Sequence, residues 1–235
     1  MGSTRLPGKV LMNVGGEPLL VRILNKVMPL MQDYQIFVAT TTNTIDDVLE
    51  QTCRSLGVEC YRGSETDVLT RFYKLAELKN LDVIVRLNAD CPMLSASFVK
   101  KQIIQFLDEK SKYDYASTIL SETYPVGMHV EIIRFEALKI AHLNCLNAEL
   151  REHVTPYIYQ NPNLFKLLSI KSGINLSSLR LTIDYDVDIS FINALIEKLV
   201  FYKKSGTISD ILWIIKKHPE LKLINQNIKK LQRIL

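Results

Sequence analysis

Two periodicities alternate along the first half of this 235-residue chain, and this alternation limits the folds that it can adopt. Short apolar runs rich in β-branched residues are typical of buried strands, and longer segments with apolar residues every three or four positions are typical of helices. Strands and helices that alternate across short links predict a parallel sheet covered on both faces. The expected strands are 34–40, 58–62 and 81–90, and the expected helices are 18–31, 44–57, 65–80 and 95–110.

The pattern becomes less regular after about residue 112. We expect a single domain spanning residues 1–235, since this length suits one α/β domain. Within it, the segment of about 113–172 is expected to be an insertion that completes a substrate site or forms a dimer interface. The elements predicted in the second half are strands at 113–118, 129–135, 164–171 and 179–183, and helices at 135–144, 147–161, 187–202 and 207–217.

Composition predicts a soluble cytoplasmic protein. Hydrophobic residues make up 47% of the chain and charged residues 23%, as in ordinary globular proteins. No apolar run is long enough to span a membrane, and the four cysteines are scattered, which favours reduced thiols. The basic excess lies in residues 203–235, where solvated helix faces are a better interpretation than a nucleic-acid surface, because no nucleic-acid-binding motif accompanies it.

The chain opens with MGSTRLPGKV, which has the features of a polyphosphate-binding loop. Its small and hydroxyl residues permit close backbone approach, and its arginine and lysine can clamp phosphate oxygens. The Pro-Gly pair between the two cations fixes a turn. The loop is neither a Walker A motif nor a GxGxxG fingerprint, and the alternative is a polar tail. The expected phosphate-binding residues are Gly2, Ser3, Thr4, Arg5 and Lys9.

Two aspartates follow strand-like runs. Asp90 ends the apolar run 81–90, and Asp184 follows the run 179–183. Ligands bind at the carboxyl ends of parallel strands, so both acids are expected to face the opening loop. Mg²⁺ takes one or two protein carboxylates and completes its shell with water and phosphate oxygens. Either aspartate alone is more typical of a cap or a turn than of a metal site, but together they predict a Mg²⁺ site for phosphoryl or nucleotidyl transfer.

Other polar residues are further binding candidates. Those at strand ends are expected to face the same edge as the acids and to bind a nucleotide. Those in the middle segment lie among apolar positions, where a cap, a salt bridge or a dimer contact is as good an interpretation as substrate binding. The nucleotide candidates are Thr41, Arg62 and Asn88, and the substrate candidates are His129, Glu131, Arg151 and His153.

A series of short stretches carries a family signature over nearly the whole chain. In order, they are MGSTRLPGK, GGEPLL, VATTTN, YRGSETDVLTRF, RLNADCPM, YPVGMHVE, REHVTPYI and TIDYDVDI. They resemble the cytidylyltransferase-like family typified by the spore-coat polysaccharide biosynthesis protein SpsF, which is related to the CMP-sialate and CMP-Kdo synthetases. Each stretch alone is a weak signal, whereas the ordered series is specific.

The resemblance implies a nucleotide-diphospho-sugar transferase fold, with a Rossmann-like, mostly parallel sheet and helices on both faces. It also implies that a sugar hydroxyl attacks the α-phosphate of CTP with the help of Mg²⁺, so that an acidic sugar receives CMP and pyrophosphate leaves, for cell-surface polysaccharide biosynthesis. A homodimer is expected. The family's first strand precedes the opening loop, so the chain is expected to be N-terminally truncated and to lack that strand.

The resemblance also implies roles for individual residues. Arg5 and Lys9 match the family's phosphate-binding cations and are the expected catalytic residues. Arg62 and Asp67 lie in the stretch YRGSETD, which matches a family segment near the nucleotide. Asp90 and Asp184 match the metal-binding aspartates.

The sequence departs from the family pattern at the acceptor side. Val126 and His129 stand where acids are expected, which indicates an acceptor other than sialate or Kdo. Two alternatives remain: a glycosyltransferase that uses a nucleotide-sugar donor, and a non-catalytic nucleotide-binding or structural subunit. The glycosyltransferase is disfavoured because residues 88–90 carry one carboxylate instead of a DxD pair.

Overall fold

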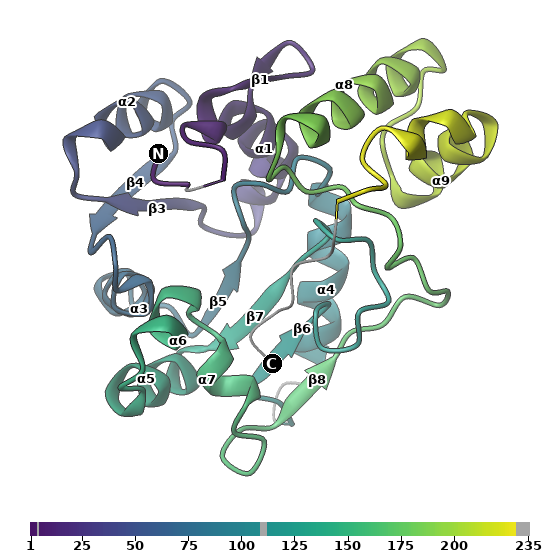
Figure 1. Ribbon diagram of the computed structural model, residues 1–235. Helices are drawn as coiled ribbons and strands as arrows, with labels where there is room; N and C mark the ends of the chain where they lie inside the picture. The colour runs from purple at the N-terminus through teal and green to yellow at the C-terminus, as the bar shows by residue number, and fades with distance from the viewer. Residues whose placement is uncertain (4, 109–111, 229–235) are drawn as a thin grey trace.

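The structure is a computed structural model that describes residues 1–3, 5–108 and 112–228. Strands and helices are interleaved along the chain, and the expected α/β class is confirmed (Figure 1). Across these residues no helix has the length and apolar character needed to cross a membrane. The described helices are α1 (Leu19–Val27), α2 (Asp47–Ser55), α3 (Val68–Leu78), α4 (Ala96–Asp108), α5 (Phe135–Asn144), α6 (Ala148–His153), α7 (Pro156–Tyr159), α8 (Asp186–Phe201) and α9 (Ile208–Lys217), with 3-10 turns η1 (Lys9–Leu11), η2 (Met28–Gln32), η3 (Thr44–Asp46) and η4 (Pro219–Leu223).

The strands form two main ladders and a small hairpin. The first ladder pairs β3 with β4 in parallel, and the second has the order β5-β7-β6-β8. In the second ladder β7 runs antiparallel to β5 and β6, whereas β6 and β8 are parallel. The strands are β1 (Asn13–Val14) and β2 (Glu17–Pro18) of the hairpin, β3 (Phe37–Thr41), β4 (Glu59–Gly63), β5 (Val83–Arg86), β6 (Tyr115–Ser117), β7 (Glu131–Arg134) and β8 (Leu167–Ser169).

The sheet is therefore mixed, because the chain returns after β6 as an antiparallel neighbour and needs no crossover helix there. The strands predicted in the middle segment are present but shorter than expected. Among the described residues the two ladders do not pair with each other. The missing first strand and the domain limits remain predictions.

Alternate side chains of the second ladder enter two different cores. Ile132 and Ala116 belong to the core that includes Phe106 of α4. Their neighbours Ile133 and Tyr115 belong to the core that includes residues of α3, α5 and α7. Successive side chains of a strand point to opposite faces, so this alternation confirms that helices cover both faces of the sheet.

The single helix predicted at 147–161 is interrupted. It ends as α6, and Val154 then adopts a left-handed conformation with φ 73° before α7 begins at Pro156. A proline lacks the N–H that helix continuation requires and restricts the residue before it, so the apolar periodicity alone overestimated this helix.

The segment 179–183, expected to be a strand, forms only an isolated bridge between Val126 and Arg180. It is nevertheless held in an extended path near the other strands. The N–H of Ile183 donates to the carbonyl of Asp90 at 2.9 Å. This contact brings the end of the segment to the loop that follows β5.

Gly127 permits the close approach of the loop at Val126 to this segment. Its φ is +96°, and a Cβ atom added there would lie 2.5 Å from the backbone nitrogen of Thr182 and 2.6 Å from the carbonyl carbon of Leu181. Backbone atoms cannot yield to such an overlap. The loop therefore requires glycine for both its conformation and its packing.

We predict that Gly127→Ala destabilises the protein well beyond the conformational penalty of a left-handed residue. Gly16 is the matched control, because its φ is +94° and an added Cβ would meet nothing within 4 Å. Gly16→Ala should cost about 1–2 kcal/mol, and Gly127→Ala a further ~1–3 kcal/mol from overpacking. Urea unfolding of both variants checks this, and equal losses would show that the contact with residues 181–182 is unimportant.

Candidate active site

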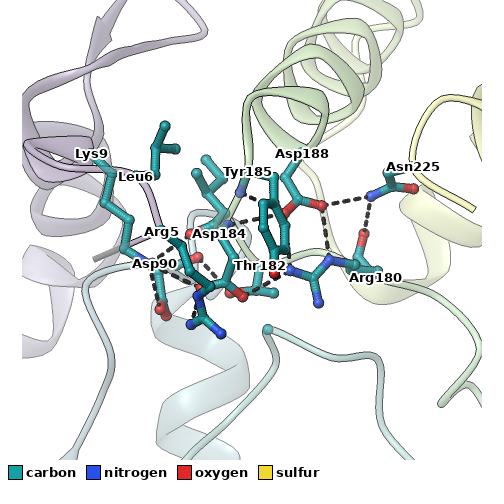
Figure 2. A network of polar contacts seen from close by, with 12 residues as sticks. Arg5, Leu6, Lys9, Asp90, Arg180, Thr182, Asp184, Tyr185, Asp188 and Asn225 are labelled. Atoms are coloured by element: carbon teal, nitrogen blue, oxygen red, sulfur yellow. Dashed lines mark hydrogen bonds and ion pairs between the residues drawn. The ribbon is translucent and has the colours of Figure 1, made fainter. Parts of the chain in front are cut away.

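Lys9 lies at one end of the polar network drawn in Figure 2, where it contacts both Asp90 and Asp184. Gly8, with φ 70°, turns the opening loop into η1, so that the lysine side chain enters the protein. Its Nζ lies 2.9 Å from Asp90 Oδ2, 3.2 Å from Asp184 Oδ1 and 2.7 Å from the carbonyl oxygen of Ile183. One ammonium group thus joins the opening loop to both candidate metal ligands.

Lys9 is only 9% exposed, so its charge has largely lost its contact with water. A buried ammonium is stable only where it is paired and hydrogen-bonded. Asp90 and Asp184 provide the compensating charges. The strand-end positions predicted these neighbours, and the structure places all three residues together.

Arg5 contacts the Asp184 carboxylate, which Lys9 also contacts, from the solvent side. Its NH2 lies 2.7 Å from Asp184 Oδ1, and its guanidinium carbon lies 6.0 Å from the centre of the Tyr185 ring. The Arg5 side chain is 38% exposed, in contrast to the buried lysine. Arg5 is therefore the more accessible of the two loop cations to an anionic ligand.

Asp184 accepts hydrogen bonds from three cations. Lys9 and Arg5 contact Oδ1, and Arg180 NH2 lies 2.8 Å from Oδ2. Burial by itself would raise the pKa of this carboxyl, but Lys9, Arg180 and Arg5 together hold it below the usual value of 3.8. Asp184 is therefore ionised at neutral pH, as a metal ligand must be.

Asp90 is more open than Asp184. Its side chain is 24% exposed, and its Oδ1 accepts a hydrogen bond from the thiol of Cys91 at 3.3 Å. Burial raises the pKa of Cys91 well above 9.0, with the negative charge of Asp90 adding to the shift. The thiol is thus protonated and serves as a donor to Asp90, not as a nucleophile.

The two carboxylates suit Mg²⁺ by donor type. Within residues 1–3, 5–108 and 112–228, no group of three or more His, Cys, Asp or Glu side chains could hold a metal ion. Asp90 and Asp184 would therefore need phosphate oxygens and water to complete a metal shell, which is how Mg²⁺ is usually bound. To bind the ion, Asp184 Oδ1 would have to lose its hydrogen bond from Arg5.

The other residues predicted to bind the nucleotide lie at or just after the ends of β3, β4 and β5. Each of them makes a hydrogen bond within the protein. The Thr41 hydroxyl donates to Asp46 at 2.6 Å. Arg62 donates from Nε to the Thr41 carbonyl at 2.8 Å and from NH1 to Asp47 at 2.5 Å. The carbonyl of Asn88 accepts the N–H of Cys91 at 3.3 Å. Nucleotide binding by Thr41, Arg62 and Asn88 remains a prediction.

The remaining loop residues are placed only in part. An added Cβ on Gly2 would lie 3.5 Å from Oε1 of Glu65, and the hydroxyl of Ser3 accepts the N–H of Leu6 at 3.3 Å. Thr4 lies outside the described residues. Phosphate binding by these residues remains a prediction.

Asp67 and Arg151 bind each other. Asp67 caps α3 by accepting the N–H of Thr70 at 2.9 Å, and its Oδ2 accepts Nε and NH2 of Arg151 at 3.0 and 2.9 Å. Arg151 NH1 donates to the carbonyls of His142 and Cys145. This geometry ties α6 to α3 and supports the salt-bridge interpretation, while nucleotide and substrate contacts by the pair remain predictions.

Glu131 is buried inside the sheet layer at 3% exposure. Its carboxylate pairs with Arg86 and accepts the hydroxyls of Tyr115 at 2.7 Å and Thr155 at 2.5 Å. Burial would raise the pKa of Glu131, but Arg86 and the two hydroxyls hold it below the usual 4.5. The contacts indicate a structural ion pair, and the substrate-binding role stays a prediction that they do not support.

The two predicted histidines lie in different surroundings. His129 Nε2 accepts the N–H of Gly127 at 3.3 Å, which places its ring over the loop next to residues 181–182. His153 is the last residue of α6 and is exposed. Their roles in substrate binding remain predictions.

The sequence interpretation missed two arginines. Arg86 holds Glu131, and Arg180 contacts Asp184 and Asp188. Arg180 lies four residues before Asp184 in an extended segment, where sequence spacing does not predict that two side chains meet.

Comparisons with known proteins give the family. The sequence model of the family described as "Cytidylyltransferase" matches residues 1–216. The spore coat polysaccharide biosynthesis protein SpsF of Bacillus subtilis is 33% identical over 233 residues, covering 94% of this chain and 92% of that protein. A solved cytidylyltransferase structure from Leptospira borgpetersenii is 30% identical, with a TM-score of 0.89 and coverage of 99% of this chain and 95% of the other.

A more distant solved structure is a CMP:2-keto-3-deoxy-manno-octonic acid synthetase complexed with CTP. It is 15% identical with a TM-score of 0.60, and covers 84% of this chain and 95% of that one, so the likeness shows a shared fold.

A buried lysine between two carboxylates, one from the loop after β5 and one from the segment before α8, is consistent with a nucleotidyltransferase on this fold. The chain belongs to the cytidylyltransferase family, which confirms the resemblance and the enzyme class predicted from the sequence. Family membership favours this interpretation over the glycosyltransferase alternative.

We predict that Glu131→Gln destabilises the protein by about 3–5 kcal/mol at pH 7, because Arg86 loses its buried partner. The loss should be pH-dependent. The folded-state pKa of Glu131 lies below 4.5, so the ionised pair stabilises the protein above that pH, and this stabilisation disappears as pH falls from 4.5 through the folded-state pKa. Unfolding free energies between pH 3 and 7 measure it.

The matched control is Glu197→Gln, because this glutamate side chain is 76% exposed. It should change stability by less than about 0.5 kcal/mol. A Glu131→Gln variant as stable as this control would contradict the structural role of the ion pair.

Proposed function

We propose that this protein transfers CMP from CTP to an acidic sugar in a Mg²⁺-dependent reaction that releases pyrophosphate. The observation that carries the proposal is the position of Lys9 between Asp90 and Asp184, at 2.9 and 3.2 Å. This arrangement supports the proposal because a lysine ammonium can bind phosphate oxygens and the two carboxylates beside it can supply oxygen ligands to a divalent ion.

The balance of charge in the network supports binding of a metal–triphosphate complex. The acids Asp90, Asp184 and Asp188 face three cations, Arg5, Lys9 and Arg180, so the site without ligand is close to neutral. A triphosphate is strongly anionic and would draw the exposed Arg5 away from Asp184. Asp184 Oδ1 then becomes available to a divalent cation.

In this proposal Arg5 clamps the triphosphate, and Lys9 orients the phosphate nearest the two aspartates. The sugar hydroxyl attacks the α-phosphorus and loses its proton to solvent. The bond between the α-phosphorus and the oxygen shared with the β-phosphate breaks, and pyrophosphate leaves with that oxygen. Bound Mg²⁺ would neutralise the charge that develops on the phosphate oxygens.

The acidic sugar is proposed from relatives, not from a pocket in this chain. One structural relative makes CMP-2-keto-3-deoxy-manno-octonic acid, which is a sugar acid. His129 lies closest to the active-site segment among the predicted acceptor residues, through the contact of its loop with residues 181–182. The homodimer and the cytoplasmic location remain predictions.

We predict that the protein releases pyrophosphate from CTP when a sugar acid and Mg²⁺ are present, and that Asp184→Asn lowers kcat by at least about 100-fold. Asp186→Asn is the control, because Asp186 is two residues away and exposed. This control should retain near-normal turnover.

A coupled pyrophosphate assay with CTP, UTP, GTP and ATP against sugar acids and neutral sugars makes the measurement. Turnover with neutral sugars alone would refute the acidic acceptor, and turnover with another nucleotide alone would refute CTP. No turnover with any pair, or equal effects of the two variants, would overturn the proposed reaction.

A further inference from the structure

In the network of Figure 2, Arg180 lies on the side of Asp184 that faces away from Lys9. Its NH2 is 2.8 Å from Asp184 Oδ2 and 3.0 Å from Asp188 Oδ2, and its Nε is 2.8 Å from Asp188 Oδ1. The guanidinium therefore binds Asp188 with two nitrogens while holding one oxygen of Asp184. The other oxygen of Asp184 faces Lys9 and Arg5.

Asp188 fixes the position of the arginine. Its side chain is fully buried, and its Oδ2 accepts the backbone N–H groups of Asp184 and Tyr185 at 3.0 and 3.1 Å. These contacts form the start of α8. Asp188 therefore holds both the backbone of Asp184 and the guanidinium that orients its carboxylate.

Asn225 reaches the same cluster from the C-terminal segment. Its Nδ2 donates to Asp188 Oδ1 at 3.1 Å and to the carbonyl of Arg180 at 3.4 Å, and the residue is 7% exposed. Leu221 of η4 anchors the segment in the core that contains Phe191 of α8. Asn225 lies beyond residue 216, where the family match ends.

We propose that Arg180 is a positioning residue that fixes the orientation of the Asp184 carboxylate by holding one oxygen, so that the other oxygen faces the phosphate side of the active site. We propose further that Asn225 stabilises Arg180 from outside the family-matched part of the chain. The metal part of this inference rests on the proposed function. The orientation of Asp184 toward Lys9 does not.

The physical reason is that the carboxylate of an aspartate rotates about its Cβ–Cγ bond, so that its oxygens can face the phosphate side in more than one orientation. Arg180 occupies Oδ2, so Oδ1 is the atom left for Lys9, Arg5 or an incoming cation. Without the guanidinium, Asp184 would rotate and its two oxygens would compete for the same cations. Hydrogen bonds to the ligands of a metal typically change its affinity by about 10- to 100-fold.

The first experiment tests orientation without any ligand. The coupling between Lys9→Met and Asp184→Asn is measured by unfolding in a double-mutant cycle, once in the natural background and once with Arg180→Gln. We expect the coupling to be lost when Arg180 is replaced. An unchanged coupling would overturn the positioning role, whatever the protein does with nucleotides.

The second experiment measures metal binding without turnover. Mn²⁺ replaces Mg²⁺ as a paramagnetic probe, and its binding is followed by electron paramagnetic resonance with a non-hydrolysable CTP analogue. Arg180→Gln should weaken Mn²⁺ binding by about 10- to 100-fold, and Arg180→Lys should restore part of the loss. Asn225→Ala should have a smaller effect and add nothing to Arg180→Gln, because it acts through the same cluster.

Arg22→Gln is the matched control. The Arg22 and Arg180 side chains are each 11% exposed, and Arg22 also donates hydrogen bonds, to the carbonyls of Val14 and Gly15 and not to the site residues. It should lose stability but keep normal Mn²⁺ affinity. Equal weakening in Arg22→Gln and Arg180→Gln would overturn the proposal.

Mn²⁺ binding by the natural protein separates a failure of the proposed metal site from a failure of the positioning role of Arg180. If it binds no Mn²⁺ with the analogue while the Lys9–Asp184 coupling is lost in Arg180→Gln, the metal part of the proposed function is wrong and the positioning of Asp184 by Arg180 is upheld.

Discussion

The ion pairs of Lys9 connect three distant parts of the chain. The lysine comes from the opening loop, Asp90 from the loop after β5, and Asp184 from the segment before α8. Because the ammonium is largely buried, it cannot exchange its partners for water at low cost, and the three segments must stay together. The hydrogen bond from Ile183 to Asp90 reinforces the same junction along the backbone. The position of every candidate phosphate or metal contact depends on this meeting point.

Charge compensation gives the site two layers with different mobility. Arg180, Asp188 and Asn225 form a buried layer in which each group has several partners. Arg5 forms the outer layer, since its side chain is partly exposed and contacts one carboxylate oxygen. The inner layer orients the Asp184 carboxylate and helps to hold its pKa below the usual value. In the proposed function, the outer cation would transfer to an anionic substrate. In the proposed function, this division would let a network that is neutral by itself bind a highly charged nucleotide.

The middle segment shows that charged residues predicted to bind a substrate also make structural contacts within the fold. Glu131 and Arg151 resemble substrate-binding groups in the sequence because they lie among apolar positions. In the fold, Glu131 neutralises Arg86 between the sheet and α7, and Arg151 joins α6 to the cap of α3. Both arrangements fill the hydrogen-bonding capacity of charged groups inside a packed layer, as buried polar groups require. The same residue type would be needed for substrate binding, so the sequence alone could not separate the two roles.

Local periodicity was sufficient to predict the α/β class and the acids at the strand ends, because it records which side chains are buried and where each strand stops. The ordered family stretches indicated the cytidylyltransferase family for the same chain. Periodicity could not predict the antiparallel course of β7, the break at Val154, or the contacts of Arg180 and Asn225 with residues near Asp184. Those features depend on which segments meet in three dimensions. The sequence by itself determined the elements and the chemical groups available to the site, whereas the tertiary structure decided which charges became partners, because pairing depends on distances that only the folded packing sets.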